Sequence, residues 1–296
     1  MQLETFKIFC DLVETGSFSQ AAARNEITQS AVSQQIRLLE EKYGATFFQR
    51  GGKKFAVTPE GRIFERAARE ILVTYAGIDS RLHELRDVVS GPLRVSTVYS
   101  IGFHELPTRL EAFRKLHPTV RVVVEYRRSP AIYNDIQEGR ADLGLVSYPQ
   151  RGRGIIADVF MEDELVVICA PGHRFARKKK IKLQALDGER FVAFQPDTPT
   201  RKAIDRAIKQ HRVAFAQQHE FDTIETVKRA VEVADAVSIV PRRTVEREHL
   251  AGRLCIVKLE DVDLVRPLGI LRKQARVTTP AMREFMRVML DGADPP

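Results

Sequence analysis

Residues 17–50 constrain the fold more than any other part of the chain, because they combine two short helices, a tight connection and a basic segment. Ser17, with Gln20 three residues later, fits a capping box that starts a helix through the alanines at 21–23. Thr28 is a suitable N-cap for a second helix. Apolar residues recur on one face of this second helix, at Val32, Ile36 and Leu39. Their helical spacing predicts that this face points inward.

The opposite face of the second predicted helix carries uncharged hydrogen-bonding side chains and one arginine, namely Gln29, Ser30, Ser33, Gln34 and Arg37. Glutamine and arginine can each bond bidentately to a base edge, and serine can bond to a base edge or a phosphate. A helix with these side chains near its N-terminus suits the major groove of DNA, and its positive dipole end favours phosphate. We therefore predict a DNA-binding helix. The alternative is an ordinary helical hairpin with a solvated polar face.

Two further segments complete the predicted N-terminal domain. A helix over residues 3–14 has an apolar stripe that can pack on the other two helices. After the second helix, a glycine-containing basic turn separates the apolar residues at 47–48 from those at 55–57. Its basic residues are Arg50, Lys53 and Lys54. Such a turn favours a small β-wing that contacts the DNA backbone or minor groove, so residues 1–58 are predicted to form a winged helix-turn-helix domain.

A long helix is predicted to follow, with Thr58 as its N-cap and Pro59 in its first turn. Its apolar positions alternate in spacings of four and three residues: Phe64, Ala68, Ile71, Tyr75, Ile78, Leu82, Leu85 and Val89. This 3.5-residue period is typical of a coiled-coil seam. Residues 59–91 are therefore predicted to be a linker and dimerisation helix that ends at Ser90–Pro92. The alternative is an amphipathic helix packed on the core of its own chain.

Beyond residue 92 the pattern changes to short strands that alternate with helices, which indicates an α/β region. Strands are predicted at 93–97, 120–126, 142–147, 165–170, 191–194, 237–241 and 269–272, and helices near 100–116, 131–138, 199–210, 224–233 and 280–290. We expect two lobes, the first of about residues 92–164 and 266–296, the second of about 165–265. Hinged lobes of this kind hold small ligands between them.

Hydroxyl side chains occur where predicted strands end and helices begin, at Thr97, Ser100, Ser129 and Thr198. Free backbone N–H groups converge at such places, so these four residues are predicted to bind an effector. With Arg127 and Arg128 nearby, they favour an anion, either a small organic carboxylate or an inorganic oxyanion. Each hydroxyl could equally act only as a helix cap, and both arginines could equally be solvated.

The charge of the chain is unevenly distributed. The net charge is +8 and the isoelectric point about 9.5, which fits a nucleic-acid-binding protein. Residues 1–91, however, carry 12 basic and 12 acidic side chains, so the whole excess lies after them. The densest basic run, at 177–182, is interpreted as a solvated surface loop, with an accessory DNA or anion contact as the alternative. The local distribution of charge is therefore a better guide to a DNA-binding surface than the net charge of the whole chain.

Motifs of several other protein classes are missing. The sequence has no G-x-S-x-G, H-E-x-x-H or Walker motif, so we expect no catalysis and no cofactor other than the effector. Its three cysteines are too scattered for a C-x-x-C metal site and are expected to be reduced. No basic start followed by an apolar run occurs, and the apolar stretches are too short to cross a bilayer. We expect a cytoplasmic protein without membrane contact.

The N-terminal motifs resemble those of the LysR-type transcriptional regulators. The matching pattern is Phe6, Gly16, Ser17, Ala21, Ala22, Gln29, Ser30, Ala31, Val32, Ser33, Ile36, Leu39, Glu40 and Gly44, continued by Phe47, Arg50, Thr58, Pro59 and Gly61. The resemblance extends more weakly over the rest through length, linker helix and two-lobed C-terminal region.

This resemblance implies a bacterial transcription factor with an effector domain of the periplasmic-binding-protein fold. It further implies double-stranded promoter DNA, a small-molecule effector and RNA polymerase as partners, and a homodimer or homotetramer whose DNA-binding domains are repositioned by the effector. Two other functions stay open. One is an architectural DNA-binding protein with little base preference, and the other is a solute-binding protein or enzyme whose helical head only dimerises it.

Overall fold

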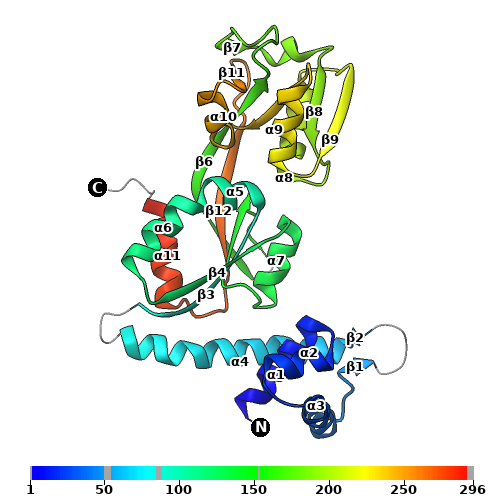
Figure 1. The fold of residues 1–296 in the computed structure, drawn as a ribbon, viewed down its shortest axis with the longest axis vertical. Coiled ribbons are helices and arrows are strands. Elements are labelled where there is room, and N and C mark those ends of the chain that lie inside the picture. The colour runs from blue at the N-terminus through cyan, green and yellow to red at the C-terminus, as the bar shows by residue number, and fades with distance from the viewer. Residues whose placement is uncertain (1, 50–54, 85–88, 153, 292–296) are drawn as a thin grey trace. The chain divides into compact units, whose positions relative to one another are not determined.

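The computed structural model describes residues 2–49, 55–84, 89–152 and 154–291, which form two compact units (Figure 1). The first unit consists mainly of the chain up to Gly91, and the second contains most of the chain from Pro92 onward. Among the described helices, none has the length and apolar character needed to cross a bilayer.

The first unit is a winged helix-turn-helix domain followed by a long helix, which confirms the predicted fold. Its elements are α1 (Leu3–Thr15), α2 (Phe18–Arg24), α3 (Gln29–Tyr43), β1 (Phe48–Gln49), β2 (Ala56–Val57) and α4 (Pro59–Glu84). The predicted caps are present: Ser17 accepts a hydrogen bond from the backbone N–H of Gln20 at 3.4 Å, and Thr28 accepts one from Ala31 at 3.2 Å. Strands β1 and β2 pair antiparallel as the wing.

Aromatic residues form the centre of the first unit's core. The ring of Phe9 is fully buried, and its centroid lies 5.4, 5.0 and 4.6 Å from those of Phe47, Phe48 and Phe64. These contacts join α1 to the wing and to α4. The apolar face of α3, made of Val32, Ile36 and Leu39, is buried in the same core, as predicted. The opposite face of α3 therefore points away from the core.

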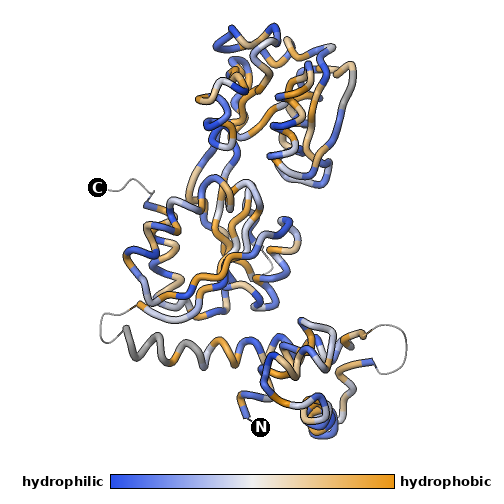
Figure 2. Tube along the Cα trace, in the orientation of Figure 1, coloured by the Kyte–Doolittle hydropathy of each residue, from blue (hydrophilic) through white to orange (hydrophobic). Residues whose placement is uncertain are grey.

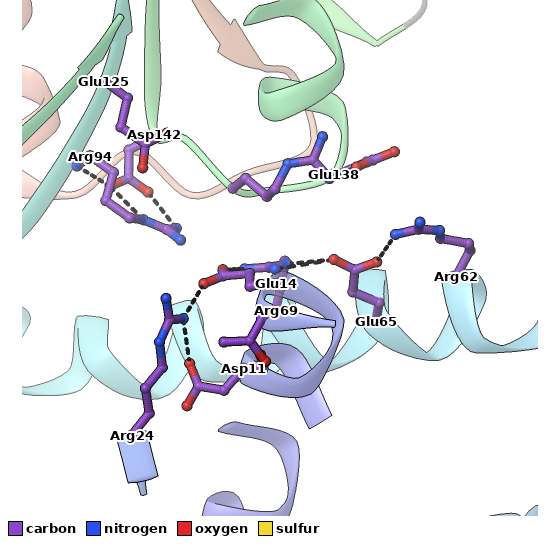
Figure 3. Close-up of polar contacts among 12 residues, drawn as sticks. Asp11, Glu14, Arg24, Arg62, Glu65, Arg69, Arg94, Glu125, Glu138 and Asp142 are labelled. Atoms are coloured by element: carbon purple, nitrogen blue, oxygen red, sulfur yellow. Dashed lines mark hydrogen bonds and ion pairs between the residues drawn. The ribbon is translucent and has the colours of Figure 1, made fainter. Parts of the chain in front are cut away.

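A chain of ion pairs ties α4 to the first two helices (Figure 3). Arg69 of α4 contacts Glu65 one turn earlier at 3.1 Å and Glu14 of α1 at 2.9 Å. Glu14 also pairs with Arg24 of α2 at 3.0 Å. Arg69 and Glu65 are both buried, so each needs the other as a partner for its charge.

The predicted seam of α4 divides into two parts. Phe64 and Ala68 are buried in the core of their own unit, whereas Ile71, Tyr75 and Ile78 are 42, 58 and 49% exposed. The side chain of Leu82 and the whole of Leu85 lie outside the described residues. Val89 is not helical, so the prediction that the seam reaches it was wrong. The chain there passes into a strand that begins with Gly91, at φ +103°, and Pro92, neither of which continues a helix readily.

The second unit has a mixed ten-stranded sheet with the strand order β4-β3-β5-β12-β6-β10-β8-β9, and short β11 and β7 beside it. The first lobe comprises β3 (Gly91–Thr97), α5 (Tyr99–His104), α6 (Leu106–Leu116), β4 (Val120–Tyr126), α7 (Ser129–Gln137), β5 (Leu143–Ser147), β12 (Val265–Lys273) and α11 (Pro280–Asp291). Figure 2 shows hydrophobic residues along the central strands of both lobes, whereas hydrophobic and hydrophilic residues alternate along the helices.

The chain enters the second lobe along the long strand β6 (Ile155–Cys169) and returns to the first lobe where β12 begins, at Val265. Strand β6 pairs with β12 up to residue 164 and with β10 from residue 165. The other elements are β7 (Lys180–Ile181), η1 (Leu183–Leu186), β8 (Arg190–Phe194), α8 (Pro199–Gln210), β9 (Gln217–Phe221), α9 (Ile224–Val233), β10 (Val237–Pro241), η2 (Arg242–Thr244), α10 (Glu246–Leu250) and β11 (Cys255–Leu259).

The structure corrects several details of the predicted second unit. The helix expected near 100–116 is two helices, which meet at Glu105 just before Pro107. The strand expected from residue 165 begins ten residues earlier, and β9 and β11 were not predicted. Charged residues at 158 and 162–164 interrupt the apolar residues of β6, and four of the five residues of β9 are polar, so neither strand stands out as one continuous hydrophobic pattern. Part of the basic run at 177–182 is not loop but strand β7, although its lysines and Arg177 are exposed as expected.

Candidate functional site

The polar face of α3 is open to solvent. Gln29, Ser30, Gln34 and Arg37 are exposed, and Ser33 is half-buried. Their contacts are local: Ser19 donates to Gln29 Oε1 at 3.3 Å, and Arg37 Nε donates to Glu41 Oε1 at 2.8 Å, one turn along the same helix. These side chains can therefore leave their present partners at small cost and bond to another molecule.

Glu40 fixes the wing relative to α3. Its Oε1 atom accepts hydrogen bonds from the backbone N–H groups of Phe47 at 2.8 Å and Phe48 at 3.4 Å. The sequence patterns gave Glu40 no role of its own, since a single carboxylate carries no local signal. The wing residues predicted to contact DNA, Arg50, Lys53 and Lys54, lie outside the described residues.

A cleft with a volume of about 120 Å³ opens in the second unit, where the ends of strands from both lobes meet. Ser100, Ser129 and Thr198, three of the four predicted effector-binding residues, line it. Thr97 does not line the cleft, because its side chain is fully buried and its hydroxyl donates to the carbonyl of Val98 at 3.2 Å. The structure thus brings together residues that are up to 98 positions apart in the sequence.

Three helices of nine residues or more begin at this cleft. Ser129 is the first residue of α7, and Thr198 and Thr223 are the N-caps of α8 and α9. The Thr198 and Thr223 hydroxyls each accept a hydrogen bond from the backbone N–H three residues later, at 3.3 Å. Both threonines therefore act as caps while they also line the cleft. The positive ends of the helix dipoles favour a negatively charged ligand there.

Two exposed arginines of the first lobe also line the cleft, but each is engaged in an ion pair. Arg127 follows β4 directly and lies 2.8 Å from Glu125 of that strand. Arg128 reaches the second lobe, where its two terminal nitrogens contact Asp197 at 3.2 Å and Gln195 at 3.0 Å. A ligand that used either arginine would compete with these protein carboxylates and amides.

A third arginine in the cleft, Arg266 of β12, was not predicted. It is 3% exposed, and its Nη2 atom donates a hydrogen bond of 2.6 Å to the hydroxyl of Ser100. Burial lowers the pKa of Arg266 below its usual value. The predicted strand began only at residue 269, so the sequence patterns left Arg266 in a loop and gave no sign of its burial.

Titratable groups elsewhere show no arrangement for a metal. Within the described ranges, no group of three or more His, Cys, Asp or Glu side chains could hold one. The three cysteines are free, and burial raises the pKa of the Cys10 and Cys169 thiols to about 12. At neutral pH these two thiols are therefore protonated.

Comparison with known proteins places both units in one family. Residues 3–62 match the bacterial regulatory helix-turn-helix protein family of lysR type, and residues 86–294 match the LysR substrate binding domain. A probable RuBisCO transcriptional regulator from Cyanophora paradoxa is 27% identical over 294 residues, which cover 97% of this chain and 91% of the relative.

Two solved structures show the same fold. Full-length OxyR from Pseudomonas aeruginosa is similar with a TM-score of 0.80 at 19% identity, covering 99% of this chain and 94% of that one. The CcmR regulatory domain from Synechocystis in complex with 2-PG has a TM-score of 0.62 at 21% identity, covering 68% of this chain and 96% of that one. The family consists of transcriptional regulators and not of enzymes, in agreement with the absence of catalytic motifs. The chain therefore belongs to the LysR family of transcriptional regulators, with a DNA-binding winged helix-turn-helix domain and an effector-binding domain of the periplasmic-binding-protein type.

Proposed function

We propose that this regulator reads specific base sequences through α3. The observation that carries this proposal is the exposed polar face of Gln29, Ser30, Ser33, Gln34 and Arg37, opposite an apolar face that is fixed in the core. Amide, hydroxyl and guanidinium groups on the first half of a helix match the hydrogen-bonding groups of the major groove. Arg50, Lys53 and Lys54 of the wing would add contacts to the DNA backbone.

In vitro selection from random duplexes tests this function directly. The full-length protein is incubated with a randomised duplex library at near-physiological salt, and the bound fraction is sequenced over successive rounds. Base-specific reading predicts one enriched motif, repeated as two related half-sites. Recovery of sequences no different from the starting library would instead support an architectural protein that contacts only phosphates.

We propose further that two copies of the chain pair through α4, which would supply the two half-site readers. Ile71, Tyr75 and Ile78 form an exposed apolar row at heptad spacing, and burial in a partner would remove it from water. In this proposal residues 1–58 bind DNA, 59–91 pair the subunits and 92–296 bind the effector. A homotetramer, contact with RNA polymerase and a cytoplasmic location accord with the same function.

The effector is proposed to be a small anion. The cleft supports this, because it combines three helix N-termini with the hydroxyls of Ser100, Ser129 and Thr198 and with three arginines. Its volume is well below that of a pocket for a drug-sized ligand, which indicates a molecule of few heavy atoms. Calorimetric titration of the full-length protein with 2-PG, inorganic phosphate, succinate and uncharged glycerol tests the charge preference. Binding of glycerol alone would contradict it.

A further inference from the structure

Arg266 places a buried positive charge at the effector cleft. Ion pairs within the protein do not fully neutralise this charge. Arg266 makes no ion pair within 4 Å among the described residues, and its one short hydrogen bond is to a neutral hydroxyl, that of Ser100. Its Nε atom is buried and has no hydrogen-bond partner in the described part of the chain. An unpaired buried guanidinium is costly, so its retention calls for a partner of opposite charge.

Two carboxylates lie near Arg266. Asp163, the register partner of Arg266 on β6, accepts a hydrogen bond from the backbone N–H of Arg243 at 3.4 Å, and its Oδ2 atom is buried without a hydrogen-bond partner in the described part of the chain. Glu105 is bonded to Arg109 at 3.1 Å and lies 3.8 Å from Arg243. Three guanidinium groups thus face two carboxylates at this place. The local charge is positive even when both carboxylates are ionised, and it can accommodate one further negative group.

We propose that Arg266 is the residue that binds the anionic group of the effector and so determines the selectivity of the cleft for anions. This inference rests on the proposed effector function. The exposed Arg127 and Arg128 are the alternative anchors, but water screens them and each already contacts a side-chain oxygen of the protein. Arg266 is shielded from water, so a charge-assisted hydrogen bond from its guanidinium to the effector is stronger.

The position of Arg266 on β12 gives this contact a structural consequence. Strand β12 pairs with β5 in the first lobe and with β6, the strand that continues into the second lobe. Thr198 at the start of α8 approaches the same cleft from the second lobe. An anion bound between Arg266 and the N-terminus of α8 therefore links the two lobes, as effector-driven closure requires.

Matched arginine substitutions test the proposal. Titrations of the full-length wild type with 2-PG, phosphate and succinate define the best-bound probe, which is then titrated into Arg266→Gln, Arg127→Gln and Arg128→Gln. We expect Arg266→Gln to weaken binding roughly 10- to 100-fold, as expected for loss of a buried charge-assisted contact. Each exposed arginine is expected to change the affinity by less than about threefold. The reverse order of effects would overturn the assignment to Arg266.

Two controls keep the test decisive. Arg266→Lys retains the charge but not the planar fork, and is expected to bind the probe with an intermediate affinity.

If Arg266→Gln does not fold, the crystal structure of the wild type with the probe decides: a guanidinium nitrogen of Arg266 within about 3.2 Å of an anion oxygen supports the proposal. An anion held by Arg127 or Arg128 alone contradicts it. A wild type that binds no anion contradicts the proposed effector, whereas an unaffected Arg266→Gln contradicts only this inference.

Discussion

The polar face of α3 and the cleft of the second unit both present hydroxyl and guanidinium groups, but the two regions hold them differently. On α3 the side chains come from nine consecutive residues, are mostly exposed and have local partners. In the cleft they come from segments far apart in the chain, and the arginine at the floor is buried. The first arrangement suits the proposed reading of DNA, because its side chains can adjust to a partner, whereas the second suits the proposed binding of one small molecule, because its groups are already held in place.

The largest effect is expected from loss of the aromatic core below α3. Phe9→Ala removes a fully buried ring that contacts three others, and is expected to destabilise the first unit by about 3–5 kcal/mol. Specific DNA binding should be lost while anion binding in the cleft persists. Thermal unfolding, DNA-binding and calorimetric measurements on one preparation check this.

A conservative variant calibrates that experiment. Phe9→Leu keeps most of the apolar volume and is expected to lose less than about 2 kcal/mol and to keep DNA binding. If Phe9→Ala abolished anion binding together with DNA binding, the two regions would not be energetically separate, and the comparison between them would fail.

The second prediction concerns pH and applies only to the second unit, at Asp163, the register partner of Arg266 on β6. Burial raises the pKa of Asp163 from 3.8 to about 6. In the folded state this group therefore holds its proton up to about pH 6, whereas in the unfolded chain it loses it near pH 4. Between these values the folded state binds more protons, so the contribution of Asp163 to stability decreases as the pH rises.

Asp163→Asn removes this titration. Compared with the wild type, the variant is expected to gain stability as the pH rises from 5 to 8, by on the order of 1–2 kcal/mol. Urea unfolding of both proteins at several pH values across this range measures the difference. Parallel stability curves would show that Asp163 does not titrate in this window.

The difference between the two regions also explains which parts of the fold and of the site could be predicted from the sequence. The helices of the first unit were predictable because caps, apolar spacing and polar face are all local to a few turns, as at Ser17, Thr28 and Val32. Their packing follows once each helix has a single apolar face.

The cleft was only partly predictable. Ser100, Ser129 and Thr198 were recognisable because a hydroxyl at a strand-to-helix junction is a local signal. Arg266 was not, since its burial depends on β5, β6 and the Ser100 hydroxyl, which lies 166 residues away along the chain. Thr97 does not line the cleft although its strand ends there as predicted, because its fully buried side chain lies against Gly102 of α5. The end of a strand can be read from the sequence, whereas the direction of its last side chain depends on how the next helix packs.

The third prediction concerns base reading by α3. Gln29→Ala and Ser33→Ala should each reduce the discrimination between the selected duplex and a scrambled one by about 1–3 kcal/mol, with little change in fold stability. Arg50→Ala, in the predicted wing, should instead weaken binding to both duplexes alike. Competition binding at fixed salt separates these results. A uniform loss on Gln29→Ala would place that side chain on a phosphate and not on a base.

The fourth prediction compares the same substitution in both regions. Thr28 and Thr198 each cap a helix by accepting one backbone N–H hydrogen bond, at 3.2 and 3.3 Å. Thr28→Ala and Thr198→Ala are each expected to destabilise the protein by about 1 kcal/mol, and Thr→Ser at either position by much less. The ligand effects should differ: Thr28→Ala should weaken DNA binding only, and Thr198→Ala anion binding only. The DNA affinity and the anion affinity of each variant are measured together with its thermal unfolding.

The smallest change in stability is expected at Arg37. Its ion pair with Glu41 is 2.8 Å long but highly exposed, the two side chains being 73 and 55% accessible, so Arg37→Ala should alter the unfolding free energy by less than about 0.5 kcal/mol. Its affinity for the selected duplex should nevertheless fall, because the proposed role of this side chain is a contact with DNA. Arg37→Lys, which keeps the charge and loses the fork, distinguishes a guanine contact from a phosphate contact: it should restore affinity only if the partner is a phosphate. A stability loss as large as that of Phe9→Ala would mean that this face of α3 belongs to the protein's interior, and DNA reading by it would then be untenable.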